Sequence, residues 1–350
     1  SRGLGDVYKR QAPDYAINKL KDLLAAQPNS ALAQRELAEK YYDNNQLTMA
    51  ADQYEKYIQN PNSFKRDKQR LVGLLFFAKR YNDSFDLASQ ILAEEPDNHY
   101  MQRLQFYNKK ALEEKDAAKA AAEKLFANPT AQLNSQDYIQ YGELLQDMGS
   151  DTLAVEMYEK AVAVSPEKTS LLKDLSAAYS SAKMYDKAAD TMAKYIDSEG
   201  ENADPNDMLS LANRYKNLAI ANLDTDSVAS AAAAAKALQT IDKVIARISD
   251  NPMVLNTKSD ILRIAARGAV TPDVVAADET TLAVLDADPS NATNERRIPI
   301  YRAVLGRLGN YYLTTAKDVE KAKVYFQKFY EVSPSDDLKA FIDGLDANAK

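Results

Sequence analysis

A small residue recurs every 34 residues through the first part of this 350-residue chain. Four and seven positions after each one stands a mostly apolar pair, as Tyr54 and Tyr57 follow Ala50. Positions i, i+4 and i+7 share one face of an α-helix, so each recurrence predicts an amphipathic helix. A unit of this length cannot bury its apolar face alone and must stack on its neighbours. The members of the series are Ala16, Ala50, Ser84, Ala118, Ala154 and Ala188, with one longer spacing of 36 between Ala118 and Ala154.

Each unit also contains an earlier helix and ends at a proline, which cannot continue a helix. In the clearest unit, Tyr141 and Gly142 precede Ala154. Two antiparallel helices approach closely only where one of them offers a small residue. We therefore expect Gly142 to lie against Ala154, and Ser176 against Ala188. The prolines that end the units are Pro28, Pro61, Pro96, Pro129 and Pro166.

The order of these residues resembles the tetratricopeptide repeat family: large, large-small, aromatic, tight turn, small-aromatic-small, proline. The resemblance covers nearly everything after residue 11 and is strongest in 31–61 and 135–200. It implies an all-α fold, a right-handed superhelical solenoid of about eight antiparallel helix pairs that ends in a capping helix. The chain lacks the tryptophan that the family often has early in the first helix.

Beyond residue 11 we expect two parts: a regular array at 12–200 that begins with a half-repeat, and a divergent array at 201–350 with longer loops and the capping helix. In the divergent part, Asn222–Ser230 is predicted to be a long loop. Ala277, Thr281 and Val284 are predicted to form the buried face of a second helix.

Residues 1–11 match a different source. Asp6–Gln11 reads as a translation of the end of a transposon-based sequencing adapter, GAT GTG TAT AAG AGA CAG. We expect this segment to be an artefact, the natural sequence to begin near Ala12 without its true N-terminus, and the source to be environmental and bacterial. Leu20 and Leu23 of the half-repeat should then be under-packed at an open end.

The composition argues against several classes of function. The net charge is −7 with acidic and basic residues mixed, whereas nucleic acid needs a basic face. No apolar run approaches the roughly 20 residues that span a bilayer. The chain has no cysteine, which removes disulfides and thiolate chemistry and slightly favours the bacterial periplasm or cell envelope. His99 is the only histidine, at an expected helix start, so His-based triads and multi-His metal sites are excluded.

The remaining metal and phosphate motifs are also incomplete. Asp286, Asp288 and Ser290 have the spacing that opens a calcium loop, but Asn291 and Arg297 stand where such a loop needs Gly and Glu. The glycines are scattered and form no phosphate loop. We predict no catalytic, cofactor-binding or metal-binding residue, and a protein that is not an enzyme.

The family resemblance does imply a binding surface. In the family, first helices line the concave groove through their second, fifth, ninth and twelfth positions. The matching side chains give a mixed polar groove with an aromatic opening near Tyr42 and Phe76, suited to an extended peptide or a partner helix. The expected groove residues are Arg35, Glu39, Tyr42, Arg66, Gln69, Phe76, Gln136, Glu143 and Lys173.

These observations favour a non-enzymatic scaffold or adaptor that binds a protein or peptide partner, not nucleic acid. Two alternatives stay open. One is a glycan- or cell-wall-binding envelope component, against which the lack of tryptophan counts because sugar-stacking sites favour it. The other is the repeat portion of a longer enzyme that is truncated at its N-terminus.

Overall fold

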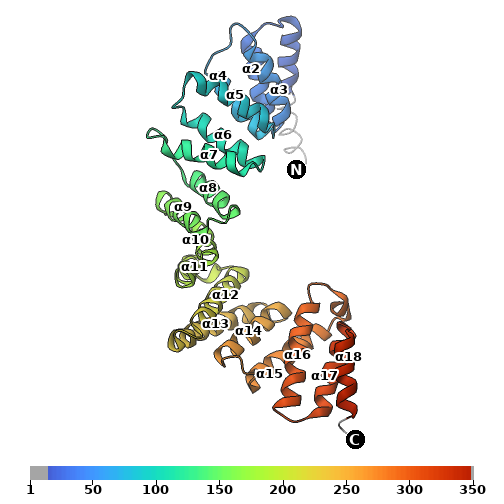
Figure 1. Cartoon of the computed structure of the whole chain (residues 1–350). Coiled ribbons are helices and arrows are strands. Elements are labelled where there is room, and N and C mark those ends of the chain that lie inside the picture. Colours follow the sequence, from blue (N-terminus) through green and yellow to red (C-terminus); the bar gives the residue numbers. More distant parts are fainter. Residues whose placement is uncertain (1–14, 348–350) are drawn as a thin grey trace. The chain divides into compact units, whose positions relative to one another are not determined.

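The structure is a computed structural model that describes residues 15–347, and this part contains helices and no strand. The adapter-like segment 1–11 lies outside the described residues. Figure 1 shows the helices following one another as antiparallel pairs. The pairs are α2 (Ala31–Asp43) with α3 (Leu47–Ile58), α4 (Asp67–Phe77) with α5 (Tyr81–Glu94), α6 (His99–Ala111) with α7 (Lys115–Ala127), α8 (Ser135–Asp147) with α9 (Asp151–Val164), α10 (Leu171–Ser181) with α11 (Tyr185–Glu199), α12 (Pro205–Asn222) with α13 (Ser227–Arg247), α14 (Pro252–Ala265) with α15 (Pro272–Asp286), and α16 (Ile298–Thr314) with α17 (Val319–Val332).

The predicted all-α fold of about eight helix pairs is confirmed for the described residues. A further helix at 15–26 precedes the first pair, and α18 (Asp336–Ala347) follows the last. The chain divides into two compact units, Ser1–Ser165 (unit 1) and Pro166–Lys350 (unit 2). Within each unit, the second helix of a pair packs against the first helix of the next pair. One core cluster of unit 2 extends from Ala189 to Ile261.

The small residues of the series lie at close helix crossings, as predicted, except for Ala16, which is half-buried. Ala154 and Ala188 are fully buried, as are Ala50, Ser84 and Ala118. Gly142 is buried beneath the ring of Tyr158, where an added Cβ would lie 2.9 Å from Cε2. The atoms nearest to Gly142 belong to Tyr158, one turn after the expected Ala154. Ser176 Oγ donates a hydrogen bond to the carbonyl oxygen of Ala188 at 2.7 Å. The spacing of small residues therefore sets where each helix pair comes together.

The predicted loop at Asn222–Ser230 is wrong. α12 runs to Asn222, and α13 begins at Ser227 with Asp226 as its N-cap. The inserted residues lengthen both helices. Alanine has the highest helix propensity, and the small residues Ala219, Ser230 and Ala234 let the two helices stay close over the added turns.

The predicted buried face of α15 is correct only at Thr281. Ala277 and Val284 are half-buried, and the helix instead turns Val274, Asp278 and Leu285 into the core. The reason is that a carboxylate occupies a core position. Asp278 is fully buried because Arg307 of α16 and Ser259 of α14 supply its partners.

The two ends differ in how well they are covered. In the helix at 15–26, Ile17 is buried and Leu20 packs against the core of α2 and α3, so under-packing at this end is found only at Leu23, which is 41% exposed. At the other end, Phe341 of α18 lies edge-on to Phe326 of α17, with ring centres 5.1 Å apart. The predicted capping helix is confirmed.

Candidate functional site

Several of the expected groove residues take part in ion pairs between neighbouring first helices. Arg35 Nε of α2 donates to Asp67 Oδ2 of α4 at 2.8 Å, and Tyr57 Oη donates to the same oxygen at 2.9 Å. The hydrogen bond to Asp67 raises the pKa of Arg35. Asp67 stands in the first turn of α4, where the helix dipole favours a negative charge. Arg35 is thus already held by its own chain.

A similar arrangement joins α6 to α8, the next first helix, although here the tyrosine stands on α6 itself and not on a second helix. Arg103 of α6 donates to both oxygens of Asp137, from Nε at 2.6 Å and from Nη2 at 2.8 Å, and Tyr107 Oη donates to Oδ1 at 2.8 Å. Asp137 is fully buried in the first turn of α8, where it also forms a capping box with Asn134. Burial, followed by the charge of Asp137, raises the pKa of Tyr107. This bidentate pair fixes α6 against α8.

A third copy lies in unit 2. Lys173 Nζ of α10 is 2.8 Å from Asp207 Oδ1 in the first turn of α12, and Tyr195 Oη donates to Oδ2 of the same carboxylate at 3.1 Å. A base, a first-turn aspartate and a tyrosine therefore join neighbouring first helices at three places in the described chain. These clusters stabilise the stack of first helices.

The other expected groove residues are placed differently. Glu143 contacts Lys110 Nζ, and Gln69 donates to Glu95 at 3.2 Å. Phe76 is half-buried and packs on Tyr81 and Tyr107, with ring centres 5.6 and 6.2 Å away. Arg66, at the N-cap of α4, has 79% of its side chain exposed, and Gln136 is exposed on α8.

Four side chains of unit 1 form a continuous feature on its first helices, which we name the tyrosine–arginine row: Tyr42, Arg70, Tyr100 and Arg103. The guanidinium carbon of Arg70 lies 4.3 Å from the centre of the Tyr42 ring. Arg70 is fixed there by Glu39, which accepts its Nη2 at 3.0 Å and its Nε at 3.3 Å.

Tyr100 continues the row from α6. Its hydroxyl lies over Gly73 of α4, where an added Cβ would come within 2.7 Å of the oxygen. Burial raises the pKa of the Tyr100 hydroxyl, while the neighbouring Arg70 and Arg103 act in the opposite direction. The residue as a whole is still 38% exposed, so Tyr100 is both positioned and accessible.

The sequence analysis missed Arg70, Tyr100 and Arg103. Tyr100 and Arg103 stand 34 residues after Arg66 and Gln69, so they occupy the second and fifth positions of their own first helix. The 34-residue spacing was enough to place Tyr100 and Arg103 among the groove positions, although the helix pair at 99–129 resembles the family only weakly.

In unit 2, Arg214 of α12 is in an unusual setting. Its Nε and Nη1 donate to Ser176 Oγ at 3.2 Å and Ser180 Oγ at 3.3 Å, and no carboxylate pairs with it in the described part of the chain. Burial lowers the pKa of this guanidinium. The charge is held by neutral hydroxyls alone.

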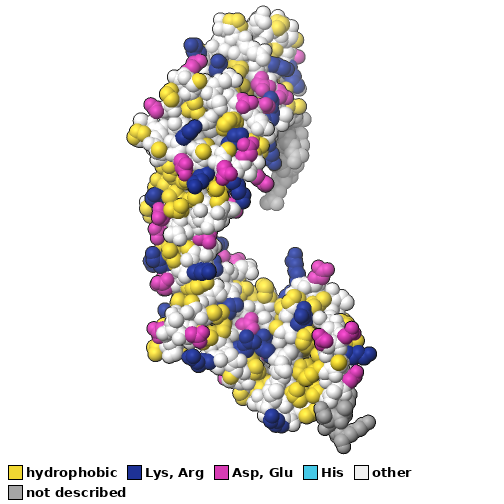
Figure 2. Space-filling view, viewed as in Figure 1, with side chains coloured by type: hydrophobic (Ala, Val, Ile, Leu, Met, Phe, Trp, Pro, Cys, Tyr) yellow, Lys and Arg dark blue, Asp and Glu magenta, His cyan; other side chains and the backbone are white. Residues whose placement is uncertain are grey.

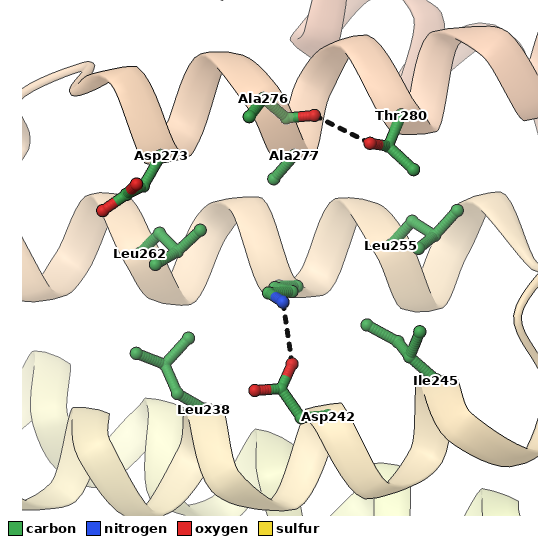
Figure 3. A pocket seen from close by; sticks show the side chains of 10 residues that line it. Leu238, Asp242, Ile245, Leu255, Leu262, Asp273, Ala276, Ala277 and Thr280 are labelled. Carbon is green, nitrogen blue, oxygen red and sulfur yellow. Dashed lines mark hydrogen bonds and ion pairs between the residues drawn. The ribbon is translucent and has the colours of Figure 1, made fainter.

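An open pocket of about 490 Å³ lies in unit 2 between α13, α14 and α15. Figure 3 shows Leu238 and Leu262 near one end and Ile245 and Leu255 near the other, with Ala277 above them. Lys258 Nζ of α14 pairs with Asp242 of α13 at 2.8 Å in the middle of the pocket. The sequence analysis did not predict this pocket, because its α15 wall depends on the register of that helix.

The carboxylates of the incomplete calcium motif have local structural roles. Asp288 Oδ1 accepts the amide of Ser290 at 3.0 Å, and Asp286 accepts Tyr301 Oη at 3.1 Å. Residues 15–347 contain no group of three or more acidic or histidine side chains that could hold a metal ion. In the same range, no helix is long and apolar enough to cross a membrane.

No protein-family sequence profile matches the chain, and no curated protein matches it in sequence. Its structure is similar to the C-terminal part of a TPR repeat-containing protein from Cytophaga hutchinsonii, with a TM-score of 0.60 and 19% identity over 79% of this chain and 99% of that one. It is also similar to YrrB, described as a TPR protein with an unusual peptide-binding site, with a TM-score of 0.46 and 16% identity over 59% of this chain and 98% of that one. A third likeness is to a human IFIT1 dimer with m7Gppp-AAAA, with a TM-score of 0.42 and 13% identity over 97% of this chain and 77% of that one. From the helix pairs, the buried small residues and the first of these likenesses, this chain has the tetratricopeptide-repeat fold.

Proposed function

We propose that the chain is a non-enzymatic scaffold that holds a peptide or helix of a protein partner against the first helices of unit 1. The observation that carries this proposal is the tyrosine–arginine row. Two tyrosines from α2 and α6 stand beside Arg70, and the Tyr100 ring is accessible while its hydroxyl is seated over Gly73.

Tyrosine and arginine are, with tryptophan, enriched among the side chains that contribute most of the binding energy at protein interfaces. A tyrosine ring offers a large contact area and loses little conformational freedom when it is covered. Here the freedom is already restricted, because Glu39 holds Arg70 and Arg70 stacks on Tyr42. Because these side chains are already held in place in the free protein, binding a ligand loses less conformational entropy.

The charges of the row are balanced by its own chain. Glu39 compensates Arg70, and Asp137 compensates Arg103. A ligand would therefore gain most from ring contacts and hydrogen bonds, and little from net charge. The preferred partner segment carries apolar or aromatic side chains between polar ones. The expected groove residues of unit 1 stay predictions around this centre: Arg35, Glu39, Arg66, Gln69, Phe76, Gln136 and Glu143. Lys173 stays a predicted groove residue of unit 2.

The absence of nucleic-acid binding stays a prediction. Figure 2 shows lysines and arginines intermingled with acidic side chains on the visible face of each unit. An electrophoretic mobility shift with single-stranded RNA and with duplex DNA checks it, and a salt-sensitive shift at micromolar protein would contradict it.

The proposal is tested by selecting binders from a displayed library of random peptides on the immobilised chain. Selected peptides should bind Tyr42→Ala and Tyr100→Ala at least about tenfold more weakly than the parent, as expected for interface hot spots. Tyr15→Ala is the matched control, since Tyr15 is an exposed tyrosine of the same unit outside the row. Equal affinity for the parent and for Tyr100→Ala would remove the row from the binding site.

A further inference from the structure

The pocket of unit 2 is a groove built from three helices with one common spacing. Each helix contributes side chains at i, i+3 or i+4, and i+7, a span of two turns or about 10 Å along a helix axis. We name it the α14 groove. Its lining residues are Leu238, Asp242 and Ile245 of α13, Leu255, Lys258 and Leu262 of α14, and Asp273, Ala276, Ala277 and Thr280 of α15.

We propose that the α14 groove binds one amphipathic helix of a partner protein, with leucine-sized side chains toward α14 and a lysine or arginine toward Asp273. This surface is additional to the tyrosine–arginine row and lies in the other unit. Helices recognised in grooves use apolar anchors at i, i+3 or i+4, and i+7, which is the spacing that the three walls present.

The groove opens on the side of α14 opposite to its contact with α16. Asn256 and Asp260 of α14 accept hydrogen bonds from Arg307 of α16. At about 100° per residue, Lys258 lies about 160° around the helix from both Asn256 and Asp260, and Leu255 about 100–140° from them. The face that a first helix normally offers to a ligand is therefore used internally here, while Lys258 and Leu262 on the far side line the groove above the buried Leu255.

The groove is open because of the register of α15. Val274 and Leu285 are turned into the core together with Asp278. That leaves the small residues Ala276 and Ala277 on the groove side. Figure 3 shows Ala277 of α15 pointing toward α14 from one side, and Leu238 and Ile245 of α13 pointing toward α14 from the other.

The charges of the groove select the occupant. Lys258 and Asp242 neutralise each other in the middle. Asp273 stands at the Leu238 and Leu262 end, and no cation pairs with it among the described residues. The groove thus has a net negative charge at one end, which attracts a basic side chain and repels an acidic one. An apolar floor with one unpaired carboxylate at its end is complementary to a basic amphipathic helix.

The probe is an alanine-based peptide of about 18 residues, long enough to form a helix in isolation. It carries Leu at i, i+4 and i+7 and Lys one turn beyond, and its fluorescence anisotropy is followed as the full chain is added. A second peptide has Glu in place of Lys. The Lys peptide should bind saturably, and the Glu peptide about fivefold more weakly, which corresponds to ~1 kcal/mol for a partly exposed ion pair.

Two substitutions at exposed positions test the site. Ala276→Leu fills the groove and should abolish binding, whereas Ala231→Leu, at an exposed alanine of α13 outside it, should not. Asp273→Lys should reverse the preference toward the Glu peptide, and Asp250→Lys makes the same charge change elsewhere and should leave the preference unchanged. Circular dichroism confirms that each variant is folded. No saturable binding below about 1 mM, unaltered binding to Ala276→Leu, or an unaltered preference in Asp273→Lys would overturn the proposal.

Discussion

Arg307 of α16 and Asp278 of α15 form a bidentate ion pair inside unit 2, with Nη2 2.7 Å from Oδ1 and Nε 2.8 Å from Oδ2. Asp278 is fully buried, and Arg307 is 8% exposed. Burial by itself would lower the pKa of Arg307, but the hydrogen bonds and charge of Asp278 outweigh it and raise the value. The pair compensates two charges that neither helix could bury alone.

Removing one partner of this pair should be costly. Arg307→Met leaves Asp278 buried without its cation, and we expect a loss of about 3–5 kcal/mol in the free energy of unfolding. Urea titration followed by circular dichroism measures it. The double variant Arg307→Met/Asp278→Leu should recover most of the loss, because apolar side chains of similar volume then fill the site.

Arg214 supplies the matched control. It is half-buried against Ser176 and Ser180 without a carboxylate partner in the described chain, so Arg214→Met removes an uncompensated charge. Its free energy of unfolding should equal or exceed that of the parent. A loss from Arg214→Met as large as that from Arg307→Met would show that packing of the long side chain, not charge pairing, determines both effects.

Close helix packing is tested at glycines. Gly142→Ala places a Cβ 2.9 Å from the Tyr158 ring and should lower the free energy of unfolding by about 1–3 kcal/mol. Gly344→Ala in α18 meets no atom within 4 Å, so it should be neutral or stabilise by up to about 1 kcal/mol through helix propensity. Thermal melts of both variants check this, and a Gly142→Ala variant that melts like the parent would contradict the close crossing.

Stability should also fall in alkaline solution through Tyr301. Burial, and then Asp286, raises the pKa of this phenol to about 12. The folded state therefore retains a proton that the unfolded state loses near pH 10. The contribution of Tyr301 is present below about pH 10 and is lost as the pH rises toward 12. The difference in unfolding free energy between the parent and Tyr301→Phe should shrink from pH 9 to pH 11, and a constant difference would contradict the shift.

The sequence predicts most of the fold because its signals are local. Ala154 and Ala188 follow from the repeat length together with helical periodicity, both of which can be read from the sequence, and both residues are buried in the structure. Part of the buried face of α15 was mispredicted because the buried position of Asp278 depends on Arg307, 29 residues away on another helix. A prediction from hydrophobic periodicity places every aspartate on the exposed face of its helix. The predicted buried face of α15 therefore shifts from Asp278 to Ala277.

The candidate site was less predictable for the same reason. The positions of Arg35 and Glu39 on the first helices follow from the repeat. Whether these side chains are available to a ligand depends on the next helix pair. There Asp67 accepts a hydrogen bond from Arg35, and Arg70 donates one to Glu39. Asp67 does recur in the sequence, as Asp137 and Asp207 at intervals of 70 residues. Which basic residue each aspartate holds becomes visible only once the helices are stacked.

The central claim is that a partner segment lies on the tyrosine–arginine row, and photo-crosslinking tests it most directly. A benzophenone amino acid is introduced into a peptide selected on the parent chain, the complex with the unaltered chain is illuminated, and the crosslinked residues of the chain are identified by mass spectrometry. We predict crosslinks on and beside Tyr42, Arg70 and Tyr100, and none at Tyr15. Crosslinks confined to Tyr15 and its helix, or to residues away from the row while the peptide remains bound, would contradict the claim.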